Sequence, residues 1–387
     1  MDKWKRMGDE LYQLQEKHLY RRIKVIESAQ SAHVRYQGRD MLMLASNSYL
    51  DFCDEERIKE YAAKALMEYG TGSGGSRLTT GTTVLHTRLE EALARFKGRE
   101  AALVFNTGFA ANSGVIPALC GEGEIIYSDA KNHASIIDGC RQSKAETVIY
   151  RHNDMADLEK KILERPGKSG LIVSDGVFSM DGDIVDLPGL VKLADTYGLL
   201  SMIDEAHATG VIGATGRGCE EYYHMEGRTD ILMGTLSKAI GGEGGYVCGP
   251  CILTEYLKNK ARSYIFSTSL SPVAMAAAAR ALELIESEPW RVHRLQENIK
   301  WFCHKLQELG LNVRSETAIV PILIGEEEKA ERISDELMER GFFIPAIRYP
   351  TVGKGEAMLR AALMATHTKE ELAEAAGAIA EVICHCG

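Results

Sequence analysis

The chain contains the segment Ile231-Leu232-Met233-Gly234-Thr235-Leu236-Ser237-Lys238-Ala239-Ile240-Gly241-Gly242-Glu243-Gly244-Gly245. Its short apolar start is typical of a buried strand, and its glycines let the following backbone approach a ligand closely. Lys238 lies between these two parts, at the end of the predicted strand. Two interpretations fit: an amine that forms a Schiff base with an aldehyde, and a solvated lysine in a turn. The segment alone does not decide between them.

Five further apolar runs precede this segment, and several of them follow helical patterns. The runs are 101–105, 124–127, 147–150, 171–173 and 199–203. The clearest helix covers 190–197 and ends at Gly198, because glycine readily takes the left-handed conformation that closes a helix. Short apolar strands that alternate with helices are typical of a mostly parallel sheet covered on both faces. The sequence therefore predicts an α/β fold.

The pattern changes after residue 285. The elements predicted there are a long amphipathic helix over 292–309, a strand over 319–324, a helix over 329–340 and a last helix that begins with a capping box of Thr368 and Glu371. This mixture is typical of a smaller α+β domain. The predicted divisions are an N-terminal arm over 1–45, a large domain over 46–285 and a small C-terminal domain over 286–387.

The composition excludes several classes of partner. The chain has 387 residues, 45% of them hydrophobic and 26% charged, and a net charge of -10. No basic face emerges from this acidic balance, so we expect no nucleic acid partner. No apolar run is long enough to cross a bilayer, and the charged N-terminal stretch lacks a signal-peptide core, so we expect no membrane partner. Nine scattered cysteines favour the reducing cytoplasm over a disulfide framework.

Two close cysteine pairs invite comparison with metal sites. They are Cys248 with Cys251, and Cys384 with Cys386. A structural zinc site needs two further ligands at matching spacing, and the sequence shows none that is obvious. We therefore predict structural or incidental roles for both pairs and no metal site.

Two familiar motifs occur in the wrong context. The glycines of 70–75 match GxGxxG, but a dinucleotide fingerprint needs a strand before it, and here a helical pattern over 61–69 precedes it. We predict a substrate-facing or subunit-contact loop instead. Asp204-Glu205-Ala206-His207 spells a helicase motif, but Ile162 stands where the accompanying phosphate loop needs its first glycine. The sequence thus argues against both NAD binding and helicase activity.

Polar residues follow the predicted strands at their carboxyl ends, where ligands bind in open α/β sheets. Residues 106–112 follow the first of these strands and open a helix, whose free N–H groups suit a phosphate. The polar residues after later strands are Asp129, Asn132 and His133; Asp175 and Ser179; Asp204 and His207; and Thr235 and Lys238. Each alone fits an ordinary cap, turn or core residue. Together they suit pyridoxal 5′-phosphate (PLP), which needs a lysine, an acid for its ring nitrogen, a stacking ring and a phosphate site.

Four motifs then occur in order along the chain. They are Asn132-His133-Ala134-Ser135, Asp175-Gly176-Val177-Phe178-Ser179-Met180-Asp181-Gly182, Asp204-Glu205-Ala206-His207-Ala208-Thr209-Gly210 and Thr235-Leu236-Ser237-Lys238. With these motifs, the chain resembles the α-oxoamine synthases, which are PLP enzymes of fold type I. The resemblance runs from about Asn47 to Arg360. It implies a PLP-dependent transferase with a large domain around a mostly parallel sheet and a smaller α+β C-terminal domain.

The resemblance also implies roles for individual residues. The implied catalytic group is Lys238, which binds the cofactor aldehyde and moves the Cα proton, with His207 and His133. The other implied contacts are Asp204 at the ring nitrogen; His133 stacked on the ring; His207 and Ser179 at the ring oxygen; Gly108, Phe109 and Thr235 at the phosphate; Thr268 at the phosphate across a homodimer interface; Arg360 at the amino-acid carboxylate; Asn47 on the substrate side; and Arg21 at the acyl substrate.

Three segments resemble one branch of the family most: 70–83, 241–245 and 346–352. That branch condenses L-alanine with a pimeloyl thioester of coenzyme A or acyl-carrier protein in biotin synthesis, releasing carbon dioxide. The chain departs from its pattern at Glu205, at Asp51, where glycine is usual, and at Tyr349, where proline is common. Two alternatives stay open. One has other substrates, either glycine with acetyl-CoA or serine with a long-chain acyl thioester, and the other is a non-catalytic partner subunit of the same fold.

Overall fold

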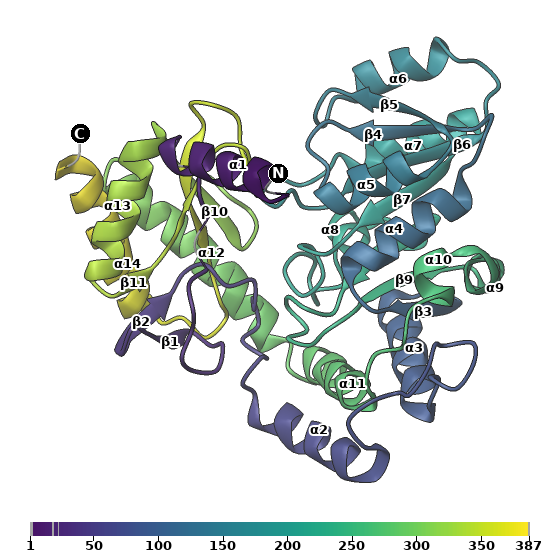
Figure 1. Ribbon diagram of the computed structural model, residues 1–387, viewed down its shortest axis with the longest axis horizontal. Coiled ribbons are helices and arrows are strands. Elements are labelled where there is room, and N and C mark those ends of the chain that lie inside the picture. The colour runs from purple at the N-terminus through teal and green to yellow at the C-terminus, as the bar shows by residue number, and fades with distance from the viewer. Residues whose placement is uncertain (1–2, 18, 22, 386–387) are drawn as a thin grey trace.

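The computed structural model describes residues 3–17, 19–21 and 23–385, and they form two lobes (Figure 1). The larger lobe is built on a seven-stranded sheet. Its strands, in spatial order, are β3 (Ala101–Phe105), β9 (Gly245–Gly249), β8 (Ile231–Thr235), β7 (Leu200–Asp204), β6 (Gly170–Asp175), β4 (Ile125–Asp129) and β5 (Glu146–Tyr150). All neighbouring pairs are parallel except those of β9, which runs antiparallel to β3 and β8. The predicted α/β fold with a mostly parallel sheet is therefore confirmed.

Both faces of this sheet are buried, which explains why its strands read as continuous apolar runs. In β3, Leu103 and Phe105 join one hydrophobic cluster, while Ala102 and Val104 join the other. The helices whose side chains join the first cluster are α4 (Gly108–Leu119), α5 (Ala134–Gln142), α9 (Cys251–Lys260) and α10 (Arg262–Ile265). In the larger lobe, the helices whose side chains join the second cluster are α2 (Glu56–Tyr69), α3 (Val84–Lys97), α6 (Met155–Leu163), α7 (Leu187–Tyr197), α8 (Cys219–Tyr223) and α11 (Pro272–Ser287).

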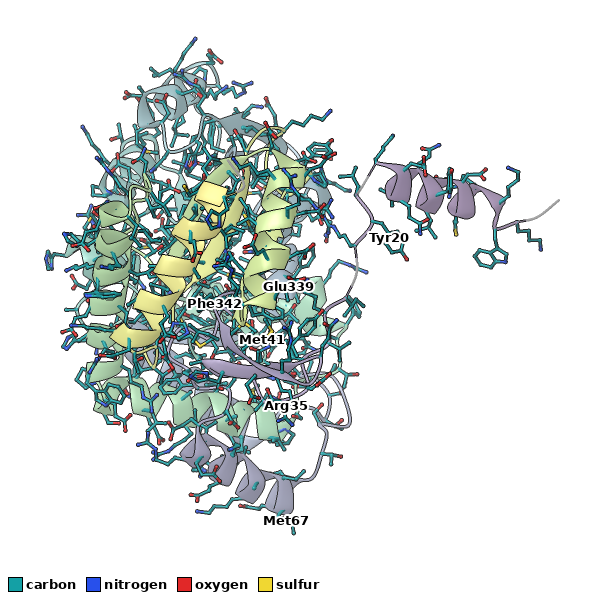
Figure 2. The ribbon with its side chains drawn as sticks, turned by 90° about the vertical axis from the view of Figure 1, so that its left-hand side faces the viewer. Tyr20, Arg35, Met41, Met67, Glu339 and Phe342 are labelled. Atoms are coloured by element: carbon teal, nitrogen blue, oxygen red, sulfur yellow. The ribbon has the colours of Figure 1, made fainter. Side chains whose placement is uncertain are left out.

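The smaller lobe combines segments from the two ends of the chain. It contains two three-stranded sheets. In spatial order, the strands of one are β1 (His33–Tyr36), β2 (Arg39–Met43) and β11 (Phe342–Phe343). Those of the other are β10 (Ile319–Gly325), β13 (Ala357–Ala362) and β12 (Ala346–Ile347). Its helices are α12 (Trp290–Glu308), α13 (Glu327–Glu339) and α14 (Lys369–His385), and α1 (Lys5–Glu16) precedes this lobe in the chain. Figure 2 shows α1 standing away from the body, in agreement with its lack of buried residues.

Local signals in the sequence mark several element ends correctly. Gly98 and Gly198 close α3 and α7 in the left-handed conformation, at φ 62° and 66°. The capping box at the start of α14 is formed, since Thr368 N donates to Glu371 Oε2 at 2.8 Å and Glu371 N donates to Thr368 Oγ1 at 3.2 Å. The predicted division of the chain at residues 45 and 285 stays a prediction, and residue 285 lies within α11.

One strand of the large sheet was not predicted as part of it. β9 is short and begins and ends with glycine, so it lacks the continuous apolar pattern of its neighbours. Among the described helices, none combines the length and the apolar character needed to cross a bilayer.

Candidate active site

The site centres on a contact between Lys238 and His207. Lys238 follows β8 and His207 follows β7, and because these strands are parallel neighbours their carboxyl ends meet. Lys238 Nζ lies 2.7 Å from His207 Nε2. Burial lowers the pKa of Lys238 to about 8, although the charges of Asp204 and Asp175 act in the opposite direction. Burial and then the charge of Lys238 lower the pKa of His207 well below its usual value, so its ring is neutral.

Asp204 lies at the tip of β7 and is buried. Its Oδ1 accepts a hydrogen bond from the backbone N–H of Ala206 at 2.9 Å, and its Oδ2 accepts one from Asn112 Nδ2 at 2.8 Å. Hydrogen bonds of this kind stabilise the charged carboxylate. Its sheet neighbour is Asp175, whose pKa is raised well above its usual value by burial and by the charge of Asp204. Both carboxylate oxygens of Asp204 thus accept a hydrogen bond.

His133 caps α5 and leaves its ring exposed. Its Nδ1 accepts from the backbone N–H of Ser135 at 3.2 Å and lies 2.8 Å from Ser135 Oγ. Its own backbone N–H donates to Asp175 Oδ2 at 2.7 Å. The ring is therefore fixed at its base and free on its face, as a stacking ring needs to be.

The start of α4 forms an anion site next to the tip of β8. Thr107 caps this helix by accepting from the backbone N–H of Ala110 at 2.9 Å, so the N–H groups at the helix N-terminus before Ala110 remain available. Gly108 packs against Thr235, since a Cβ at Gly108 would lie 3.3 Å from the Thr235 Cβ. Phe109 is 46% exposed. Gly108, Phe109 and Thr235 thus meet at one place.

Thr268 lies close to this anion site within the same chain. Asn106 Nδ2 donates to the backbone oxygen of Thr268 at 2.6 Å. The predicted contact of Thr268 across a dimer interface concerns a second chain and stays a prediction. The glycine-rich loop over 70–75 packs against the same segment, because Ser269 N donates to Gly75 O at 2.9 Å.

Arg360 connects the smaller lobe to the site. It lies on β13, and its Nε donates to the backbone oxygen of Ser179 at 2.6 Å. Its Nη2 donates to Asn47 Oδ1 at 3.2 Å. Three residues far apart in sequence are therefore brought together, and the buried guanidinium lies near Lys238 and His207, whose pKa values it lowers.

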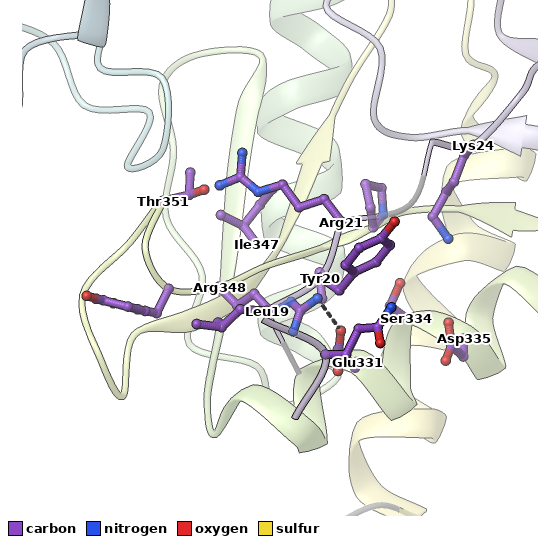
Figure 3. Close-up of a pocket in the computed structure, with 14 residues that line it drawn as sticks. Leu19, Tyr20, Arg21, Lys24, Glu331, Ser334, Asp335, Ile347, Arg348 and Thr351 are labelled. Atoms are coloured by element: carbon purple, nitrogen blue, oxygen red, sulfur yellow. Dashed lines mark ion pairs between the residues drawn. The ribbon is translucent and has the colours of Figure 1, made fainter. Parts of the chain in front are cut away.

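Arg21 lies in a cavity of its own. The cavity has a volume of about 570 Å³ and lies between Gln15, residues 19–21 and Lys24 on one side and α13 and residues 345–351 on the other (Figure 3). Tyr20, Lys24 and Arg348 also line it, and Arg348 pairs with Glu331 at 2.8 Å. No residue that lines this cavity belongs to the group around Lys238. The structure thus separates Arg21 from the other predicted site residues.

Three further residues belong to the site, although sequence reasoning gave them no specific role. Asn112 and Asp175 hold Asp204 and His133, and the hydroxyl of Tyr49 lies 2.7 Å from His207 Nδ1. The available signal for Asp175 was its place at the start of a quoted motif, after a predicted strand. For Asn112 it was its place at the end of the stretch 106–112, which was expected to bind a phosphate.

Two of the departures from the family pattern have a structural basis. Asp51 has φ of 57°, in the left-handed region where glycine is the least strained residue, and its Oδ2 accepts from Thr366 Oγ1 at 2.6 Å. Glu205 forms an ion pair at 2.6 Å with Lys97, and both side chains are buried.

Comparisons with known proteins agree with this geometry. The family model described as aminotransferase class I and II matches residues 39–379. The chain belongs to this family. It is 49% identical over 380 residues to the 8-amino-7-oxononanoate synthase of Geobacter sulfurreducens, covering 97% of each chain.

Solved structures of the family have the same fold. A serine palmitoyltransferase of S. paucimobilis with bound PLP and myriocin matches with a TM-score of 0.93 at 32% identity, covering 100% of this chain and 98% of that one. An 8-amino-7-oxononanoate synthase from Francisella tularensis matches with a TM-score of 0.77 at 30% identity, covering 89% and 98%. These findings confirm the predicted α-oxoamine synthase resemblance and fold type I.

Proposed function

We propose that this family member is an acyltransferase that condenses L-alanine with a pimeloyl thioester to give 8-amino-7-oxononanoate in biotin biosynthesis. A carbon–carbon bond forms between the alanine Cα and the acyl carbonyl carbon. The acyl carbon–sulfur bond breaks and releases the thiol carrier, and the alanine carboxylate leaves as carbon dioxide. The observation that carries the proposal is the 49% identity to a synthase of this name over 97% of both chains.

The residues at the site fit PLP, which is the cofactor we propose. The donor set comprises a partly buried lysine amine with a lowered pKa, a buried carboxyl group held by two hydrogen bonds, an exposed imidazole and a helix N-terminus. When bound, PLP supplies an aldehyde for the amine and a ring that accepts electrons from the substrate Cα. Lys238 would hold the aldehyde, Asp204 the ring nitrogen, His133 the ring face, and Gly108, Phe109 and Thr235 the phosphate.

The protein residues would then bind and orient the amino acid. Arg360 would grip its carboxylate, because a guanidinium offers two parallel N–H donors to a carboxylate. Asn47 and Ser179, which contact Arg360, hold that guanidinium in place. A pKa of about 8 at Lys238 suits an amine that takes up and returns the Cα proton at Nζ near neutral pH.

We place a part of the acyl thioester away from its reacting carbonyl carbon in the cavity that contains Arg21, since the carbonyl carbon itself must reach the alanine Cα beside Lys238. Arg21 and Lys24 supply positive charge there, while Leu19 and Ile347 supply apolar surface, a combination that suits an acyl chain with an anionic carrier. The segment over 346–352, which resembles the alanine-using branch, forms part of its wall. Arg21→Ala is expected to raise the KM for the acyl thioester and leave the KM for alanine unchanged.

We further propose that the enzyme works as a cytoplasmic homodimer. Thr268 lies beside the anion site, and Phe266 next to it is 70% exposed, as a side chain at a subunit interface would be in a single chain. Light scattering on the purified protein, before and after cofactor addition, tests the dimer. A monomer that binds PLP and turns over normally would contradict it.

The decisive experiment is carbon dioxide release and product mass with alanine and pimeloyl-CoA. Parallel reactions with glycine and acetyl-CoA, and with serine and palmitoyl-CoA, test the other substrate pairs, and pimeloyl acyl-carrier protein tests the donor. Lys238→Ala is the matched control, because it should bind PLP without a covalent bond and show no turnover. Condensation with glycine or serine in place of alanine would refute the substrate assignment.

A further inference from the structure

Tyr49 lies between two parts of the site that have separate roles. Its side chain is fully buried, and its hydroxyl lies 2.7 Å from His207 Nδ1 and 3.1 Å from Asn47 Oδ1. Beyond these two contacts, His207 Nε2 lies 2.7 Å from Lys238 Nζ, and Asn47 Oδ1 accepts from Arg360 Nη2 at 3.2 Å. A continuous chain of hydrogen bonds therefore joins the arginine proposed for the carboxylate to the reactive lysine.

The donor and acceptor of each bond in this chain of hydrogen bonds follow from the groups at its two ends. An ammonium group at Lys238 has three donors and no acceptor, so the Nε2 atom of His207 must accept. The neutral imidazole then carries its proton on Nδ1 and donates it to the oxygen of Tyr49. The hydroxyl proton of Tyr49 is left to donate to Asn47 Oδ1. In this direction every donor along the chain meets an acceptor.

We propose that Tyr49 is a positioning residue that holds His207 in its Nδ1–H tautomer, with the Nε2 lone pair facing Lys238. The inference deepens the proposed function and rests on it, since it concerns the same site. A carboxylate bound by Arg360 competes with Asn47 for the guanidinium, so substrate binding is transmitted along these hydrogen bonds to Lys238.

Other charged groups act on Lys238 and His207, but Tyr49 is the residue that hydrogen-bonds to His207 Nδ1. The groups whose charges act on Lys238 or His207 are Asp204, Asp175, Arg360 and His133. Among the described residues, the hydrogen-bond partner of His207 Nδ1 is the hydroxyl of Tyr49. Burial raises the pKa of Tyr49, so the hydroxyl keeps the proton that the chain needs.

The test uses Tyr49→Phe in the cofactor-free protein, with Tyr150→Phe as the matched control. Tyr150 is also fully buried, and its hydroxyl has no hydrogen-bond partner among the described residues. Nitrogen-15 NMR of histidine-labelled protein reads the tautomer directly, and a His207→Gln spectrum assigns the signal. We expect the Nδ1–H tautomer in the wild type and in the control. In Tyr49→Phe we expect the Nε2–H tautomer, because an Nδ1–H group would be buried without its acceptor, whereas Lys238 can lose a proton and accept at Nζ.

Two further readouts keep the inference falsifiable. Asn47→Leu removes the acceptor for the Tyr49 proton, which should then turn to His207 Nδ1 and produce the same Nε2–H tautomer. In Tyr49→Phe, the Nε2–H group faces the ammonium, so the pKa of Lys238 should fall by about 1–2 pH units. The rate of Lys238 acylation by acetic anhydride, followed by mass spectrometry against pH, measures this shift.

An unchanged tautomer in both Tyr49→Phe and Asn47→Leu would overturn the inference, even in an enzyme that condenses alanine normally. An enzyme without that condensation activity would overturn the proposed function instead, because the NMR readings need neither cofactor nor substrate.

Discussion

The buried ion pair between Lys97 and Glu205 gives the sharpest prediction of stability. Their side chains are 1% and 0% exposed, and Lys97 Nζ lies 2.6 Å from Glu205 Oε2. Lys97 also donates to Thr209 Oγ1 at 2.8 Å and to Arg217 O at 2.6 Å. Burial is the largest single effect on the pKa of Lys97 and lowers it, but the charge of Glu205, the neighbouring Tyr246 and the hydrogen bond to Glu205 together raise the pKa above its usual value. Lys97 is therefore charged in the folded protein.

Lys97→Met removes one partner and leaves the other buried. The carboxylate of Glu205 would keep the hydrogen bond from the backbone N–H of Cys219, at 2.7 Å, but would lose its positively charged partner. Removal of one member of a buried ion pair costs about 3–5 kcal/mol, because the remaining charge is left uncompensated. The double variant Lys97→Met/Glu205→Leu has no such charge and should be more stable than Lys97→Met alone.

Urea unfolding measures the free energy of unfolding for both variants. The matched control is Lys131→Met, because Lys131 pairs with Asp181 at 2.9 Å with side chains 47% and 36% exposed. Exposed pairs contribute about 0–1 kcal/mol, so the control should differ little from the wild type. A loss below about 1 kcal/mol in Lys97→Met, or a double variant less stable than the single one, would refute the reasoning.

Three further predictions concern a histidine, a glycine and an arginine. Burial opposes a charge on His152, but its hydrogen bonds to two aspartates raise its pKa to about 9 from 6.5. His152→Gln should therefore destabilise the protein most below pH 6.5 and progressively less as the pH rises through 9. Urea unfolding at several pH values measures this, and an equal loss of unfolding free energy at all of them would disprove the pairing of His152 with the two aspartates. Gly234→Ala should cost about 1–3 kcal/mol, because its Cβ would lie 2.4 Å from the ring of Tyr246, whereas Gly242→Ala, with its nearest atom at 3.6 Å, serves as the control and should cost less. Arg360→Lys should raise the KM for alanine about tenfold to a hundredfold, with a smaller effect on kcat, because a lysine cannot hold a carboxylate with two parallel N–H donors. An unchanged KM in steady-state kinetics would remove Arg360 from carboxylate binding.

The sequence by itself determined the large sheet and the family. Six of its seven strands were predicted at nearly the right residues, because strands buried on both faces must be continuously apolar, and that pattern is visible locally. The chemistry was visible for a related reason. Parallel strands bring their carboxyl ends to one edge of a sheet, so Asp204, His207 and Lys238 could be placed together from their positions alone.

The tertiary structure alone decided which distant side chains meet. β2 pairs with β11 across some 300 residues, and Arg360 reaches Ser179 and Asn47 from another lobe. Tyr49 between Asn47 and His207, and Lys97 opposite Glu205, carry no local pattern that names their partners. A buried polar group must find a partner wherever packing brings one, and packing depends on elements that lie far apart in the chain. Sequence therefore indicated which residues carry the chemistry, while the fold determined what holds them in place.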